Sequence, residues 1–120
     1  MLKVEFTIPG ECVSKDRPRF DNGHARTTGK TRYFEQSIKY LYCKRHYFEG
    51  LIKVSIHIYS KKPKKPSYLR PSKKDIDNMV KAVLDGLNCK AYKDDRYICE
   101  LQASKHYAEE ARTVVVIEDL

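Results

Sequence analysis

The sequence lacks any long apolar run. No stretch approaches the ~20 consecutive apolar residues of a membrane-spanning helix, and the residues after Met1 do not form the apolar core of a secretion signal. It also has no P-loop, no dinucleotide fingerprint and no Gly-x-Ser-x-Gly elbow. We therefore expect a cytoplasmic protein that uses neither a membrane nor an organic cofactor.

The cysteines and histidines lack the spacings of a zinc site. Without a secretion signal, the best interpretation of the cysteines is free, buried thiols in a reducing compartment. The histidines are expected to be structural or superficial. These residues are Cys12, Cys43, Cys89 and Cys99, and His24, His46, His57 and His106.

Acidic residues are too few to balance the basic ones. Sixteen Asp and Glu face 24 Lys and Arg, for a net charge of +8, which favours an anionic partner. One stretch, 61–74, contains no acid, and its Tyr68 is placed to stack on an unpaired base. A second basic stretch spans 15–32, beginning with Lys15 and including Arg26. The candidate phosphate contacts are Arg17, Arg19, Lys30, Arg32, Lys61, Lys62, Lys64, Lys65, Arg70, Lys73 and Lys74. The alternative is a pair of solvated loops.

The length of 120 residues predicts one domain, 1–120. Alternating apolar residues predict strands at 2–8 and 52–59, β-branched residues predict another at 113–117, and 98–106 is a weaker candidate. Helical periodicity predicts helices over 33–47, with Thr31 as N-cap, and over 76–87. Residues 14–32 and 61–74 are expected to be loops. The order β-α-β-α-β-β predicts an α+β fold, a small mixed sheet with two helices packed on it.

Four aspartates bracket the second predicted helix: Asp75, Asp77, Asp94 and Asp95. Carboxylates are the ligands that Mg²⁺ prefers. Two residues two apart in a helix point about 200° away from each other, so a shared ion requires an extended backbone where the chain enters the helix. Lys81, one turn after Asp77, is placed to orient it or to stabilise transition-state charge. The alternatives are a helix cap, an ordinary turn and a surface pair between Lys81 and Asp85.

The segment 74–95 resembles the signature of the RusA family of Holliday junction resolvases, in the branch found in phages and Gram-positive bacteria. It has Asp-x-Asp-Asn at 75–78, a lysine three residues later, an aspartate four after that, and paired aspartates after the helix. Arg17-Pro18-Arg19-Phe20 and Thr27 to Thr31, followed by Glu35, are similar to the N-terminal pattern of that branch. The segment 88–92 departs from the family pattern.

The resemblance implies a homodimeric endonuclease that resolves four-way DNA junctions by paired symmetric nicks, in recombination and repair. It implies Mg²⁺ as cofactor, with Mn²⁺ as a plausible substitute, and branched DNA as partner. Asp75, Asp77 and Asp95 would hold the metal, with Asp94 ranked below Asp95. Lys81 would be the essential basic residue, and the role of Asp85 is not implied. An isologous dimer would present two identical sites to a two-fold junction.

Two other functions remain open at this stage. The chain would be a non-catalytic nucleic-acid-binding module if its acids were only caps and turns. It would be a metal-dependent nuclease of flaps or RNA if the site acted on another structure.

Overall fold

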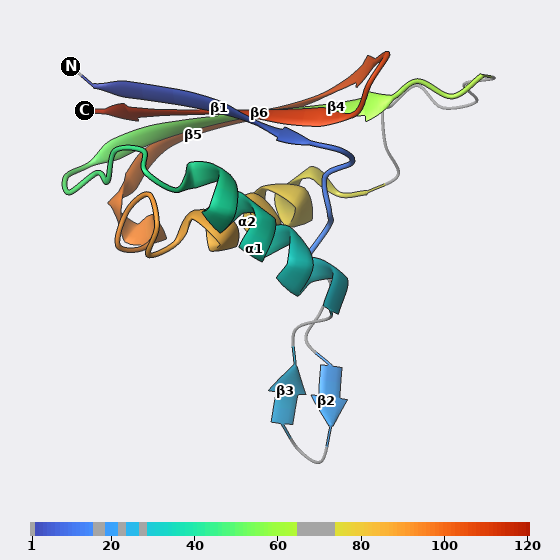
Figure 1. Cartoon of the computed structure of the whole chain (residues 1–120), viewed down its shortest axis with the longest axis horizontal. Coiled ribbons are helices and arrows are strands. Elements are labelled where there is room, and N and C mark those ends of the chain that lie inside the picture. The colour runs from blue at the N-terminus through green and yellow to red at the C-terminus, as the bar shows by residue number, and fades with distance from the viewer. Residues whose placement is uncertain (1, 16–18, 22–23, 27–28, 65–73) are drawn as a thin grey trace.

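Two helices cover one face of a four-stranded sheet in the computed structural model (Figure 1). The structure describes residues 2–15, 19–21, 24–26, 29–64 and 74–120. The elements are β1 (Lys3–Pro9), β2 (Arg19–Asp21), β3 (His24–Arg26), α1 (Gly29–Tyr42), β4 (Ile52–Lys61), α2 (Ile76–Leu87), the 3₁₀ turn η1 (Asp95–Tyr97), β5 (Ile98–Ala108) and β6 (Arg112–Asp119). This arrangement confirms the predicted α+β fold.

The main sheet is mixed, with strand order β1-β6-β4-β5. β6 pairs antiparallel with both β1 and β4, whereas β4 and β5 run parallel. A parallel pair needs a crossover connection, and α2 provides it. α2 links these two neighbouring strands, and β5 is the outer strand on that side of the sheet.

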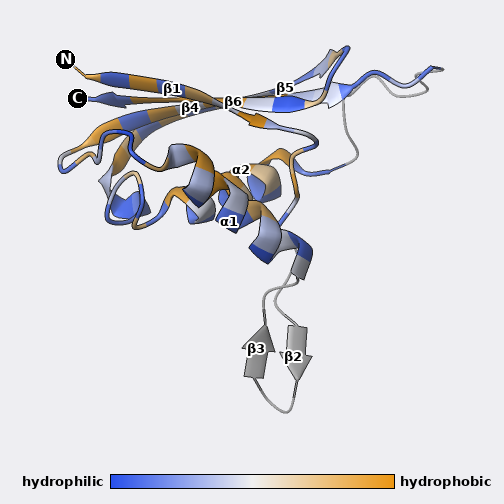
Figure 2. Ribbon diagram, in the orientation of Figure 1, coloured by the Kyte–Doolittle hydropathy of each residue, from blue (hydrophilic) through white to orange (hydrophobic). Residues whose placement is uncertain are grey.

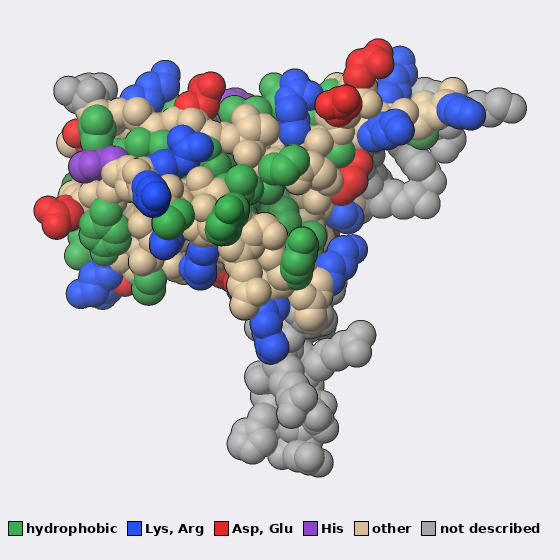
Figure 3. Space-filling model, viewed as in Figure 1, with side chains coloured by type: hydrophobic (Ala, Val, Ile, Leu, Met, Phe, Trp, Pro, Cys, Tyr) green, Lys and Arg blue, Asp and Glu red, His purple; other side chains and the backbone are tan. Residues whose placement is uncertain are grey.

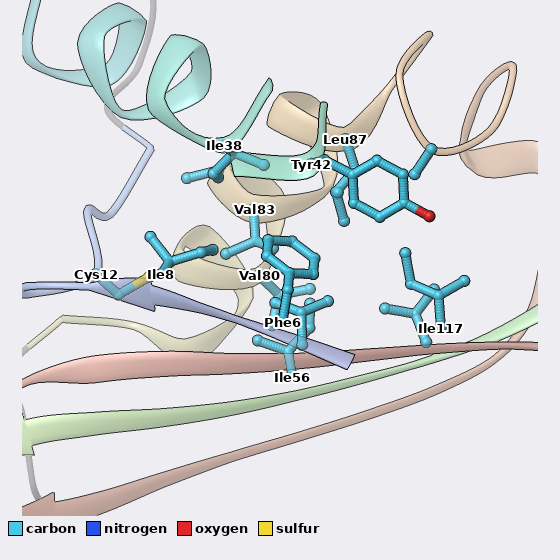
Figure 4. Packing of buried hydrophobic residues seen from close by; sticks show 14 of the residues in the cluster. Phe6, Ile8, Cys12, Ile38, Tyr42, Ile56, Val80, Val83, Leu87 and Ile117 are labelled. Carbon is cyan, nitrogen blue, oxygen red and sulfur yellow. The ribbon is translucent and has the colours of Figure 1, made fainter. Parts of the chain in front are cut away.

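The core lies between the sheet and the two helices (Figure 4). Phe6 and Ile56 from the sheet meet Ile38 of α1 and Val83 of α2, and each of these side chains is buried. Hydrophobic residues recur along both helices and along the strands of the main sheet (Figure 2). Burial of this kind contributes about 25 cal/mol for each Å² of apolar surface, so the core holds α2 firmly against the sheet.

Two boundaries differ from the sequence-based expectation. The first helix covers Gly29–Tyr42 rather than 33–47, and the predicted N-cap Thr31 is buried inside its first turn. The helix stops early because Lys44 adopts a left-handed backbone, with φ of 68°, which a helix cannot continue. The expected loop at 14–32 contains the hairpin of β2 and β3. Alternation over strands of only three residues is too short to give a sequence signal.

All four cysteines are free thiols, but only Cys12 is buried. The expectation of burial was wrong for the other three, because each lies at a turn or on an outer strand. Among the described residues, no helix is long and apolar enough to cross a membrane.

Candidate active site

α2 begins where the sequence places it, and Asp75 is the residue at its N-cap. The backbone of Asp75 is extended, with φ of −74° and ψ of 133°. Its carbonyl accepts a hydrogen bond from the Met79 N–H at 3.1 Å, but its side chain makes no capping bond. The carboxylate of Asp75 is therefore exposed and uncommitted to the helix, unlike that of an ordinary N-cap aspartate.

Asp77 lies two residues after Asp75, inside the first turn of α2. Its carboxylate accepts a hydrogen bond from the Asn78 N–H at 2.9 Å, and the side chain is exposed. We expected that both aspartates could face one ion only if the backbone were extended there. The structure has an extended backbone at Asp75 but a helical one at Asp77. An acid in the first helical turn is also favoured by the helix dipole.

The paired aspartates after α2 have different surroundings. Asp94 caps the turn η1: its carboxylate accepts from the Arg96 N–H at 2.9 Å and forms an ion pair with the Arg96 guanidinium. These hydrogen bonds hold the pKa of Asp94 below its usual range. Asp95 is exposed and forms no ion pair among the described residues. Of the two carboxylates, that of Asp95 is thus the more available.

Buried Tyr92 supports this turn from beneath. Its hydroxyl donates to the Leu84 carbonyl at 3.3 Å, tying the turn to the last part of α2. Burial raises the pKa of Tyr92, and the nearby charges of Asp95 and Asp85 raise it further.

A groove of about 390 Å³ runs between α2 and β5. Its floor is apolar, and its charged lining consists of Asp77, Lys81, Asp85 and Asp95. The structure therefore brings Asp77, Lys81 and Asp95 to one groove. The apolar lining residues are Ile76, Val80, Leu84, Leu101 and Ala103. Asp75 does not line this groove, although it precedes Ile76 directly.

The three candidate carboxylates are ligands of the type that a hard divalent cation takes, but their side chains do not converge on one point. Asp75, Asp77 and Asp95 offer carboxylate oxygens of the type Mg²⁺ takes, and none is ion-paired among the described residues. No group of three acidic, histidine or cysteine side chains in the described part of the chain is close enough to hold a metal. Exposed carboxylates repel one another without a cation, which is consistent with side chains that stay apart.

Lys81 is exposed on α2 and has no ion pair among the described residues. The surface pair between Lys81 and Asp85, one alternative raised by the sequence, is absent there. Asp85 instead binds the ammonium group of Lys15, which also lies 3.4 Å from the Glu35 carboxylate. Sequence reasoning missed this cluster because its members come from three segments far apart in the chain.

The candidate phosphate contacts are only partly described. Lys30 and Arg32 are exposed on α1, and Lys61, Lys62 and Lys64 are exposed at the end of β4. Lys74 is different, since its ammonium group donates to the Cys12 carbonyl at 2.8 Å and it is half-buried. Outside the described residues or side chains lie Arg17, Arg19, Lys65, Tyr68, Arg70 and Lys73.

One face of the molecule mixes basic and apolar side chains (Figure 3). Lys and Arg side chains lie around exposed hydrophobic ones on the side where α1 is in front. Tyr33 and Tyr40 of α1 are among the most exposed aromatic residues, at 75% and 82%. Basic and aromatic groups together are typical of nucleic-acid surfaces.

Comparison with known proteins places the chain in a family. Residues 9–118 match the sequence model of the family described as endodeoxyribonuclease RusA. The chain is also similar to the uncharacterised protein YqaN of Bacillus subtilis (strain 168), at 36% identity over 138 aligned positions that cover 98% of this chain and 96% of YqaN. Because the family match spans almost the whole sequence, this chain belongs to the RusA endodeoxyribonuclease family.

Proposed function

We propose that the protein is a Mg²⁺-dependent endonuclease that resolves four-way DNA junctions by paired symmetric nicks, in the cytoplasm and in the service of recombination and repair. Membership of an endodeoxyribonuclease family supports the cleavage of DNA. The observation that carries the site assignment is the groove between α2 and β5, which brings Asp77, Lys81 and Asp95 together in a lining that also includes Asp85 and is otherwise apolar.

Asp75, Asp77 and Asp95 are the proposed metal ligands, with Asp94 less suited because Arg96 occupies its carboxylate. A bound Mg²⁺, or Mn²⁺ as a substitute, would act as a Lewis acid on the phosphodiester and help to generate the nucleophilic hydroxide. The proposed role of Lys81 is to place its ammonium group against the charge that develops on the scissile phosphate. Once DNA covers the groove, its apolar floor would limit the water there and so strengthen both interactions.

Basic residues outside the groove are the proposed contacts to the DNA arms. Lys30 and Arg32 on α1 and Lys61, Lys62 and Lys64 after β4 are exposed, and their binding would release counterions from the phosphates. The same role is proposed for Arg17, Arg19, Lys65, Arg70, Lys73 and Lys74. Two copies related by a two-fold axis would present two such sites to one junction, so we propose a homodimer.

The experiment compares cleavage of four end-labelled substrates: a four-way junction, a plain duplex, a flap and single-stranded RNA. Each is incubated with the protein in Mg²⁺ and, separately, in EDTA. We expect two symmetric nicks in the junction, in Mg²⁺ only. Preferred cutting of the flap or the RNA would replace the proposed substrate with another.

A non-catalytic binding role is the second candidate, and one observation favours it: no described group of three side chains is gathered for a metal. This candidate predicts junction binding with a steep salt dependence and no cleavage in Mg²⁺ or Mn²⁺. The same substrate panel, read by both gel shift and strand cleavage, separates the two candidates.

A further inference from the structure

Lys15 joins three parts of the fold at the side of the candidate site. Its ammonium group binds the Asp85 carboxylate on α2 and lies 3.4 Å from Glu35 Oε1 on α1. Its backbone N–H donates to the Asn78 carbonyl, in the first turn of α2, at 3.0 Å. The Lys15 and Glu35 side chains are each 18% exposed and that of Asp85 is 22% exposed, so water screens this cluster only partly.

Asp85 has a second lysine within reach. Lys81 precedes it by four positions on α2, and side chains at that spacing are neighbours on a helix surface. Both Lys81 and Asp85 line the groove. In the described part of the chain, however, Asp85 is paired with Lys15 while Lys81 has no ion pair. The Asp85 carboxylate is thus paired with Lys15, which is not among the residues that line the groove.

We propose that Lys15 is a positioning residue that occupies Asp85 and thereby leaves the Lys81 ammonium group available to a DNA phosphate. The inference rests on the proposed function, because it concerns the same lysine of the same site. It gives Asp85 a role as the anchor for Lys15. It also moves Lys15 from the predicted DNA-binding stretch to the support of the site.

The surroundings of the two lysines explain why they differ. Lys15 faces two carboxylates, and its side chain is only 18% exposed, so packing already limits its rotamers and little further freedom is lost when it pairs. Burial opposes its charged form, but the hydrogen bond and charge of Asp85 prevail and raise the pKa of Lys15 above its ordinary value. Lys81 is exposed and would lose more freedom in the same pair.

The first experiment is a double-mutant cycle on single-turnover junction cleavage, using Lys15→Met, Asp85→Asn and the double variant. In Lys15→Met, Asp85 is released to capture Lys81, and we expect the rate at saturating DNA to fall about two- to fivefold, as for an ion pair at this spacing in a partly buried groove. Asp85→Asn should retain most of the rate, and adding it to Lys15→Met should restore the lost activity. Equal losses in both single variants without rescue would overturn the proposal.

A matched control separates positioning from stability. Lys39 also ties α1 to the end of α2, through the Gly86 and Asn88 carbonyls at 2.9 and 2.8 Å, but it touches no carboxylate in the described structure. Lys39→Met is expected to lower the unfolding temperature without any rescue by Asp85→Asn. A loss in Lys15→Met that appears only in DNA affinity, with the saturated rate unchanged, would also contradict the proposal.

A second readout needs no nuclease activity. The NMR chemical shift of Lys81 Nζ reports its pairing, and we expect it to move in Lys15→Met and to return in the double variant. Asp85→Asn alone should leave it unchanged, and a large shift there would show that Asp85 already pairs with Lys81 in the wild-type protein. The comparison of Asp85→Asn with wild type stands even if Lys15→Met does not fold, and it remains informative if the protein cuts no junction.

Discussion

At the scale of single residues, two adjacent aspartates differ in how far their contacts leave the carboxylate available to a metal. Asp94 and Asp95 are adjacent carboxylates, yet Arg96 holds only Asp94 among the described residues. The sequence predicted that Asp95 would be the functional member on the basis of family resemblance. The contacts of Asp94 give an independent physical reason for the same ranking, because a carboxylate already neutralised by a guanidinium is a weaker metal ligand.

We expect Asp95→Asn to reduce Mg²⁺-dependent junction cleavage far more than Asp94→Asn. Asp94→Asn removes the ion pair with Arg96 and weakens the cap of the turn η1, which changes the position of Asp95 only indirectly. Single-turnover cleavage of the two variants at matched protein concentration checks this order. A larger loss in Asp94→Asn would assign the ligand role to the other aspartate.

The reactivity of the four cysteines tests which of their thiols are buried. Burial raises the pKa of Cys12 to about 11, so its reactive thiolate is scarce below that pH in the folded protein. We expect iodoacetamide at pH 8 to label Cys43, Cys89 and Cys99, which are exposed, while Cys12 reacts only after unfolding. Peptide mass spectrometry reads the result. Rapid labelling of Cys12 in the folded protein would show that its segment opens readily.

At the scale of elements, both helices were predicted, but only α2 had its bounds predicted correctly. The apolar face of α2 repeats without a break from Ile76 to Leu87, and the helix has those bounds. α1 has a weaker periodicity, and its end depends on the left-handed Lys44, a conformation that local pattern does not reveal. The groove and the cluster of Lys15, Glu35 and Asp85 could not be predicted, because they arise from packing between distant segments.

Close contact between the helices gives an element-scale prediction. Gly86 of α2 faces Ile38 of α1, and a Cβ at this glycine would lie 2.7 Å from Ile38 Cδ1 and 2.9 Å from its Cβ. We expect Gly86→Ala to lower the free energy of unfolding by about 1–3 kcal/mol through overpacking. Urea denaturation of Gly86→Ala and of wild type measures the difference.

Gly50→Ala is the matched control, since a Cβ there meets nothing within 4 Å. We expect its unfolding free energy to stay within about 0.5 kcal/mol of wild type. If Gly86→Ala were equally harmless, α1 and α2 would pack less tightly than the structure shows.

At the scale of the whole molecule, charge and symmetry set the expected behaviour toward DNA. The net charge of +8 and the exposed lysines of α1 and β4 favour a polyanion. The mixed sheet with helices on one face was predicted from the order of elements and is confirmed. The homodimer stays a prediction, as does the number of nicks it makes.

Sedimentation velocity tests the dimer directly. We expect the protein at micromolar concentration to sediment with twice the 14.1 kDa mass of one chain, and one dimer to bind one junction. A protein that remains monomeric both free and on the junction would lack the two-fold symmetry that paired nicks require.

The central claim is that carboxylates at the start of α2 serve metal-dependent cleavage rather than cap the helix. Asp75 is the sharpest case because its side chain makes no capping bond. The decisive measurement is single-turnover cleavage of a synthetic four-way junction by wild type and Asp75→Asn in Mg²⁺, with junction binding measured alongside. The account predicts that Asp75→Asn binds as tightly as wild type, or more tightly because a repelling charge is gone, and does not cut. Nicking by Asp75→Asn at the wild-type rate would contradict it.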